Sequence, residues 1–100
     1  MAASRYRIQF SPDAESHLRA LTARQQRTVL ENVQDKLTFQ PTVQSRNRKQ
    51  LRPNHLATWE LRVGDLRVYY IISSPDFVSI VAVGVKVRDR VYIGGEEFEL

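Results

Sequence analysis

The sequence predicts an α+β fold with the element order β-α-α-β-β-β, in which a helical hairpin packs on one face of a twisted, mainly antiparallel sheet. Near the start, a short segment alternates polar and apolar residues, and patterns typical of helix starts follow it. Segments with the patterns of β-strands make up most of the second half. The most informative segment is 59–70, where apolar and polar residues alternate on both sides of Gly64-Asp65. That alternation is typical of a half-buried β-hairpin. Helices and strands are therefore expected to be segregated along the chain.

The first half of the chain predicts one strand and two helices. Residues 5–10 alternate polar and apolar side chains, as a strand does. The Ser-Pro pair at 11–12 supplies an N-cap and a proline at the first helical position, so a short helix begins here. Thr22 and Gln25 have the spacing of a capping box, which starts a second helix. Pro41 is expected to end that helix because it disfavours helical geometry in the residue before it.

A basic loop and the hairpin begin the second half. Residues 41–55 show little periodicity and are expected to form a loop. The hairpin strands are expected at about 56–63 and 66–73. Glycine at the first central position suits a two-residue type II′ turn, so Gly64 and Asp65 are expected to form the loop between the strands.

The last third predicts two further strands. Ser74-Pro75-Asp76 is expected to form a turn. Residues 77–86 are dense in β-branched side chains, which indicates a central strand covered on both faces. Residues 91–93 are expected to add a short edge strand. The length predicts one domain spanning 1–100.

The hairpin predicts two chemically different faces. The apolar face carries Trp59, Leu61, Val63, Leu66, Val68 and Tyr70. The other face carries Glu60, Arg62, Arg67 and Tyr69. Arg62 and Arg67 lie opposite each other, and their repulsion costs stability unless an acid or an anion lies with them. This arrangement favours a polyanion-binding face.

Composition excludes several classes of function. The 100 residues include no cysteine, which excludes a disulfide framework, a thiolate metal site and a cysteine nucleophile. The two histidines, His17 and His55, form no metal-ligand pattern with carboxylates, so we expect neither a metal nor a cofactor. No apolar signal core or membrane-spanning segment is present, which predicts a cytoplasmic protein that does not engage a membrane.

The net charge of +4 is unevenly distributed. One basic cluster comprises Arg46, Arg48, Lys49 and Arg52, and a second comprises Lys86, Arg88 and Arg90. The end of the chain is acidic, with Glu96, Glu97 and Glu99. Two basic clusters suit RNA, DNA or an acidic protein partner, while a single cluster is more often a solvated surface.

Three segments together resemble the RelE/ParE toxin superfamily of bacterial toxin–antitoxin modules. They are the hairpin WELRVGDLRVYY, the strand VSIVAVGVKVRDRVY and the basic approach RNRKQLRPN. The resemblance runs from about Tyr6 to Tyr92 and also covers the size and the element order. It implies a RelE-like fold, the toxin role in a type II toxin–antitoxin system, and a cognate antitoxin as partner.

RelE-type members of this superfamily are endoribonucleases that cleave mRNA on the ribosome without a metal, leaving 2′,3′-cyclic phosphate ends. By resemblance, Arg67 would stabilise the transition state, Lys86 would support it, and Tyr92 would transfer a proton or stack on a base. RelE carries lysines where this chain has Thr58 and Glu60, so Glu60 would replace them as a general base. The expected RNA-binding residues are Arg46, Arg48, Lys49, Arg52, Arg62, Arg88 and Arg90.

Two alternatives to an mRNA interferase stay open at the level of sequence. A ParE-like toxin would bind a DNA topoisomerase and inhibit it without hydrolysis, which fits the missing lysines. A degenerate member would bind its antitoxin or RNA without being toxic.

Overall fold

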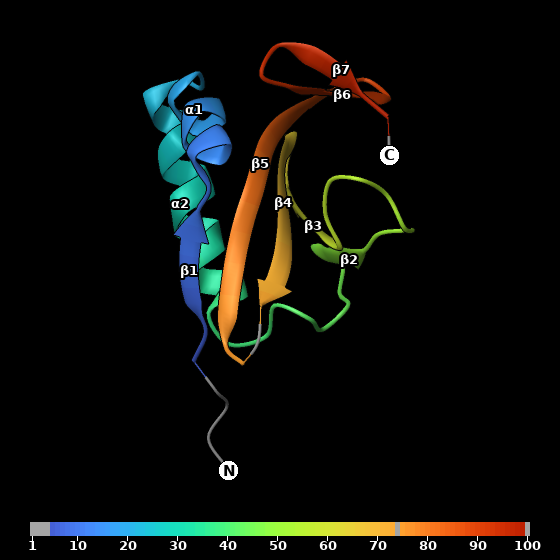
Figure 1. Ribbon diagram of the computed structural model, residues 1–100. Helices are drawn as coiled ribbons and strands as arrows, with labels where there is room; N and C mark the ends of the chain where they lie inside the picture. Colours follow the sequence, from blue (N-terminus) through green and yellow to red (C-terminus); the bar gives the residue numbers. More distant parts are fainter. Residues whose placement is uncertain (1–4, 74, 100) are drawn as a thin grey trace.

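The computed structural model describes residues 5–73 and 75–99, and it places both helices on one face of a twisted sheet (Figure 1). The helices are α1 (Pro12–Arg19) and α2 (Ala23–Leu37). The strands are β1 (Arg7–Phe10), β2 (Arg48–Gln50), β3 (Trp59–Val63), β4 (Leu66–Ser73), β5 (Phe77–Val87), β6 (Arg90–Ile93) and β7 (Glu96–Phe98). This architecture confirms the predicted α+β fold.

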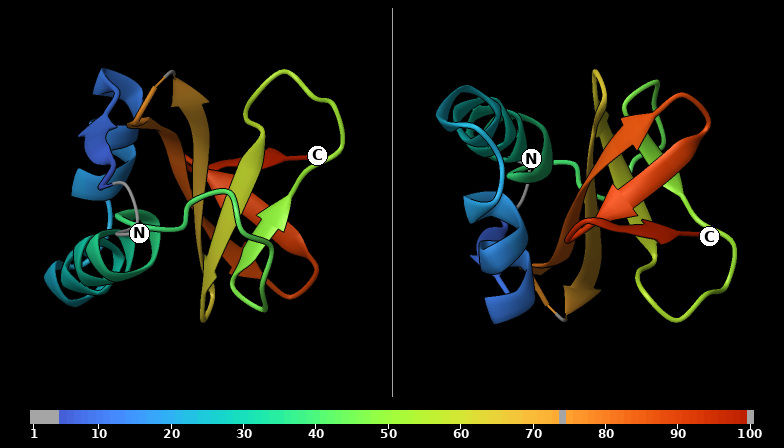
Figure 2. Two further views of the ribbon diagram at one scale, coloured as in Figure 1. Left: turned by 90° about the horizontal axis from the view of Figure 1, so that it is seen from below. Right: turned by 90° about the horizontal axis from the view of Figure 1, so that it is seen from above.

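The strands follow the order β2-β3-β4-β5-β6-β7, and all of these neighbours are antiparallel. β1 pairs in parallel with the first half of β5, and β6 pairs with its second half. β5 is therefore the central strand, as expected from its β-branched composition. The views along the sheet show its twist and the position of the helices on a single side (Figure 2).

The caps expected at both helix starts are present. The Ser11 hydroxyl accepts a hydrogen bond from the Ala14 amide, and Thr22 and Gln25 form a reciprocal capping box. The second helix ends at Leu37, earlier than the position of Pro41 suggested. The Tyr6 amide donates to the Thr38 carbonyl, so contact with the β1 segment turns the chain out of the helix before the proline.

The central hairpin has the predicted register throughout. Val63 pairs with Leu66, and Arg62 pairs with Arg67. Gly64 has φ of +57°, while Asp65 is not among the described residues with positive φ. This combination fits a type II′ turn, in which only the first central residue requires positive φ.

Two expectations about the strands are wrong. The basic loop contains β2, which pairs with β3; the Arg62 amide donates to the Asn47 carbonyl beside this pair. Both faces of β2 are polar, so the segment has no alternation that could have revealed it. The strand at 91–93 is not an edge strand, because β7 pairs with β6 beyond Gly94-Gly95, whose φ values of +59° and +83° make a hairpin turn. Ser74 of the expected turn at 74–76 lies outside the described residues.

Each face of the sheet has its own apolar cluster. On the helix side, buried residues of α2 such as Val29 and Leu37 pack with Leu61, Val68 and Tyr70 of the hairpin. On the opposite side, the smaller cluster consists of Tyr69, Ala57 and Ala82, with half-buried apolar residues around them. Trp59 stacks on Tyr70 with ring centroids 6.3 Å apart, as its place on the apolar face predicts. In the described part of the chain, no helix is long and apolar enough to cross a membrane.

Replacing Gly84 by alanine is expected to lower the free energy of unfolding by about 1–3 kcal/mol, because a core position would be overpacked. A Cβ at Gly84 would lie 2.9 Å from the Tyr92 carbonyl oxygen and 2.9 Å from Cγ1 of Ile93, so β6 would have to move. Gly64→Ala is the matched control, since its Cβ would meet no atom within 4 Å and only its positive φ is unfavourable. Thermal denaturation of both variants measures the difference, and a Gly84→Ala protein as stable as the wild type would contradict the close approach of β6.

Candidate functional site

A groove of about 730 Å³ lies between the β2–β3 side of the sheet and the β6–β7 hairpin. Its basic residues are Lys49, Arg52, Arg62 and Arg90. Its acidic residues are Glu60, Asp89, Glu97 and Glu99. The two basic clusters of the sequence therefore meet at one place, and acidic side chains accompany them. We call this feature the charged groove.

Glu60 and Arg62 form an ion pair in the charged groove. Arg62 Nε donates to Glu60 Oε1 over 2.7 Å. The Glu60 side chain is 6% exposed and that of Arg62 is 43% exposed. A buried carboxylate is costly unless it is paired, so Arg62 compensates Glu60. Glu60 is thus an acid within the chain that can offset the repulsion between Arg62 and Arg67, which lie opposite each other.

Arg67 is buried, and its side chain donates hydrogen bonds to backbone carbonyls at the β3–β4 turn. Its Nη1 donates to the Gly64 carbonyl over 2.7 Å and to the Leu66 carbonyl over 2.8 Å. The residue is 7% exposed. These bonds hold the β3–β4 turn, and no ion pair links Arg67 to an acid among the described residues. Each of the two arginines that suggested a polyanion therefore has at least one hydrogen-bond partner within the chain.

Tyr69 lies under this face of the sheet, next to Glu60. It is fully buried, and its hydroxyl has no hydrogen-bond partner in the described part of the chain. Burial and, after it, the negative charge of Glu60 raise the pKa of the Tyr69 phenol above its ordinary value. The phenol therefore stays protonated near neutral pH and is a poor proton donor.

The strand register separates Tyr92 from the other predicted catalytic residues. Tyr92 faces Val85 across the β5–β6 pair, and Val85 packs against the helix-side core. Arg67 faces Gly84, one position along β5, so it lies on the opposite face of the sheet. Lys86, two positions from Gly84, lies on the Arg67 face and is half-buried. The fold brings Glu60, Arg67 and Lys86 to one face, and Tyr92 to the other.

The basic loop divides into structural and solvent-facing residues. Arg48 donates from Nε to the Val43 carbonyl and from Nη1 to the Lys36 carbonyl, so it binds the C-terminal end of α2. Lys49 and Arg52 line the charged groove, and Arg46 is exposed beside β2. Position along the chain gave no sign that Arg48 differs from its neighbours.

The second basic cluster is also divided. Arg90 pairs with Glu97 at 3.3 Å, on the β6–β7 wall of the groove. Arg88 lies in the turn between β5 and β6 and is exposed. The acidic lining by Asp89, Glu97 and Glu99 was not predicted. In the sequence, only the acidic end of the chain indicated this lining. Its place in the groove became clear from the pairing of β7 with β6.

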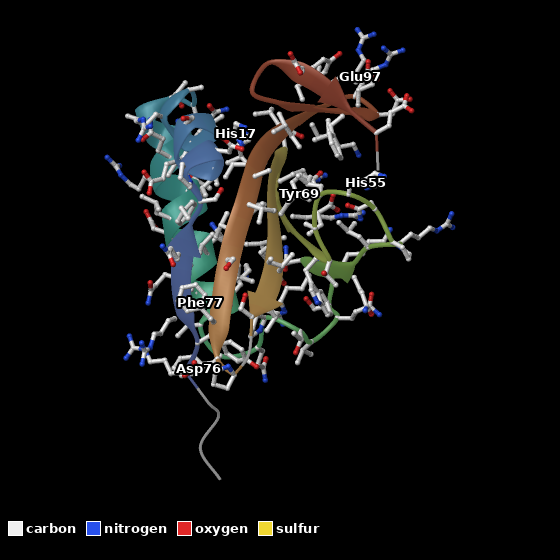
Figure 3. All side chains as sticks on the ribbon, viewed as in Figure 1. His17, His55, Tyr69, Asp76, Phe77 and Glu97 are labelled. Atoms are coloured by element: carbon white, nitrogen blue, oxygen red, sulfur yellow. The ribbon has the colours of Figure 1, made fainter. Side chains whose placement is uncertain are left out.

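The histidines lie apart in the fold. His17 lies between α1 and β5, whereas His55 lies on the loop before β3, on the other side of the sheet (Figure 3). His17 Nδ1 accepts a hydrogen bond from the Val83 amide, so it joins α1 to the central strand. Among the described residues, no group of three or more potential ligands could hold a metal ion.

Comparison with known proteins gives the family. The model of the "ParE toxin of type II toxin-antitoxin system, parDE" matches residues 8–90. The chain belongs to the ParE toxin family. It is also similar to a chain of the toxin–antitoxin complex RelBE2 from Mycobacterium tuberculosis, with 28% identity and a TM-score of 0.71. That alignment covers 82% of this chain and 99% of the other. No curated protein matches the sequence.

Membership of the ParE toxin family confirms the predicted RelE/ParE superfamily and its RelE-like fold. The chain is the toxin of a type II toxin–antitoxin system. The similar structure was determined as a complex of a toxin with its antitoxin, which supports a cognate antitoxin as partner of this ParE-family toxin.

Proposed function

We propose that this toxin acts by binding a DNA topoisomerase and inhibiting it, without cutting RNA. The observation that carries the proposal is the register of β5 and β6, which puts Tyr92 on the face opposite Arg67. The match to the ParE family model supports the same conclusion. The ribonuclease activity expected from the RelE resemblance stays a prediction.

RNA cleavage by the 2′-hydroxyl needs a base, cations and an acid around one phosphate. Glu60 is the candidate base, but its buried carboxylate already accepts from Arg62. Arg67 is the candidate phosphate ligand, but its Nη1 donates to two backbone carbonyls. The candidate acid, Tyr92, lies on the other face. Glu60 would therefore have to leave Arg62 to act as a base, and Tyr92 would have to reach the phosphate from the other face.

The charge of the groove supports a protein partner. Four cationic and four acidic side chains line it, so it offers no uniformly positive path for a polyanion. Mixed charge of this kind gives specificity for a protein surface that carries the complementary pattern. The cations Lys49 and Arg52, which form no ion pair among the described residues, lie on one wall, and the acids Asp89 and Glu99 lie on the other.

The test compares two activities of the same purified toxin. We expect it to inhibit DNA supercoiling by a bacterial topoisomerase in a concentration-dependent way, and its antitoxin to relieve the inhibition. We expect no new RNA 5′ ends within codons after induction, because the register of β5 and β6 puts Tyr92 on the face opposite Arg67. Tyr92→Phe is the matched control and should inhibit as the wild type does. Cuts within codons that depend on Tyr92, with unaffected supercoiling, would refute the proposal and support the ribonuclease.

A further inference from the structure

The turn between β5 and β6 has an unfavourable backbone conformation. Val87 pairs with Arg90, so Arg88 and Asp89 form a two-residue hairpin loop. Arg88 has φ of +60°, and it is the only residue other than glycine with positive φ in the described part of the chain. Positive φ is costly for a residue with a Cβ, and hairpin loops of this kind favour glycine, asparagine or aspartate there.

The same chain has glycine at the first loop position of two other two-residue hairpins. The β3–β4 loop, Gly64-Asp65, also has two residues, with φ of +57° at Gly64. The β6–β7 loop, Gly94-Gly95, has glycine at both positions. Gly64-Asp65 and Arg88-Asp89 thus differ at one residue while sharing the positive φ. At position 88, therefore, the chain has a residue type that is unfavourable for its backbone conformation.

The Arg88 side chain makes no polar contact with the described residues that would compensate for this conformation. It is exposed and forms no hydrogen bond or ion pair with any residue that the structure describes. Its neighbour Val87 is 53% exposed, one of the few large apolar side chains at the surface. Backbone strain without local compensation is concentrated at functional positions.

From these observations we propose that the β5–β6 turn is a contact element for the toxin's target, with Arg88 binding a carboxylate on an acidic protein surface and Val87 packing beside it. The inference rests on the proposed function in one respect, namely that the toxin acts by binding a protein. A charged arginine at a protein contact, next to apolar surface, is a common energetic centre of such interfaces.

The neighbours of Arg88 favour a protein over a nucleic acid. Asp89 is adjacent in the same turn and would repel a phosphate backbone. An exposed valine gains from burial against an apolar surface and gains nothing from phosphates. The turn also borders the charged groove through Asp89 and Arg90, so one partner could contact both.

The test uses Arg88→Gly in the full-length toxin, with Arg88→Lys and Arg27→Gln as controls. Arg88→Gly relieves the strain, so its melting temperature should rise by a few degrees. It also loses the side chain, so binding to purified topoisomerase should weaken about tenfold or more, in line with an interface arginine. Arg88→Lys keeps the charge and the strain and should retain most of the affinity. Arg27→Gln removes one charge from an exposed site on α2 and should change neither quantity.

An assay of growth arrest on induction distinguishes a failure of this inference from a failure of the proposed function. Arg88→Gly should fail to arrest growth while it still binds the antitoxin and melts higher than the wild type. An Arg88→Gly toxin that arrests growth like the wild type would overturn the role of the turn, even if topoisomerase inhibition is observed. A wild type that does not inhibit topoisomerase would refute the proposed function, and the growth assay would still decide the role of Arg88. Binding of the wild type to DNA alone, lost in Arg88→Gly, would also overturn the protein-contact proposal.

Discussion

Arg67→Ala is expected to lower the free energy of unfolding by about 3–5 kcal/mol, since hydrogen bonds from a charged donor contribute about 1.5–3 kcal/mol each. The substitution removes two such bonds, to the Gly64 and Leu66 carbonyls, and empties a site that is only 7% exposed. For a domain of this size, the melting temperature should fall by more than about 10 °C. Circular dichroism on heating measures it.

The same variant distinguishes a structural arginine from a catalytic one. A catalytic Arg67 would give a folded, inactive Arg67→Ala toxin with nearly the stability of the wild type. A structural Arg67 gives loss of toxicity together with loss of stability. Arg62→Gln is the comparison, because its side chain is 43% exposed and it keeps a hydrogen-bond donor near Glu60. It should be distinctly more stable than Arg67→Ala, and the reverse order would contradict the assigned roles.

The protein is expected to lose stability steeply above about pH 10, because two buried tyrosines must stay protonated in the folded state. Burial raises the pKa of Tyr69, with a further contribution from Glu60, and burial also raises the pKa of Tyr70. Since both pKa values are higher in the folded than in the unfolded chain, the stabilising contribution is complete below pH 10. It is lost as the pH rises above 10, at about 1.4 kcal/mol per pH unit for each tyrosine.

Denaturant unfolding between pH 9 and pH 11.5 measures this dependence. Tyr69→Phe should remove about half of the slope, because it leaves Tyr70 as the other buried phenol with a raised pKa. Tyr70→Phe should also reduce the slope, but it sacrifices the hydrogen bond to the Pro41 carbonyl and should cost stability at pH 7. A stability that is flat from pH 9 to pH 11.5 would show that both phenols are accessible to solvent in the folded state.

Local patterns predicted the parts of the fold that local interactions determine. The Ser11 and Thr22 caps and the Gly64-Asp65 turn depend on residues within a few positions of one another. The alternation along the hairpin fixed its register, because a shift of one residue would move every apolar side chain to the wrong face. β2 and β7 were missed since their pairing partners, rather than their own composition, make them strands.

The sequence named Lys49, Arg52 and Arg90 as binding candidates, and these residues line the charged groove. That the two basic clusters meet there was not predicted. The sequence did not indicate which of the cationic side chains form hydrogen bonds within the chain. Arg48 binds carbonyls at the end of α2, and Arg67 binds its own turn, whereas the sequence presented both as free cations.

By itself, the sequence determined the first strand, the two helices, the two faces of the hairpin and the membership of the superfamily, because these follow from periodicity, turn chemistry and motifs along the chain. Only the tertiary structure decided which charges are available to a partner. The fold brings the Lys36 carbonyl at the end of α2 to Arg48, and strand pairing places Tyr92 on the other side of the sheet from Arg67. A charge is free or engaged according to which groups the folded chain brings within hydrogen-bonding distance, and spacing along the sequence does not contain that information.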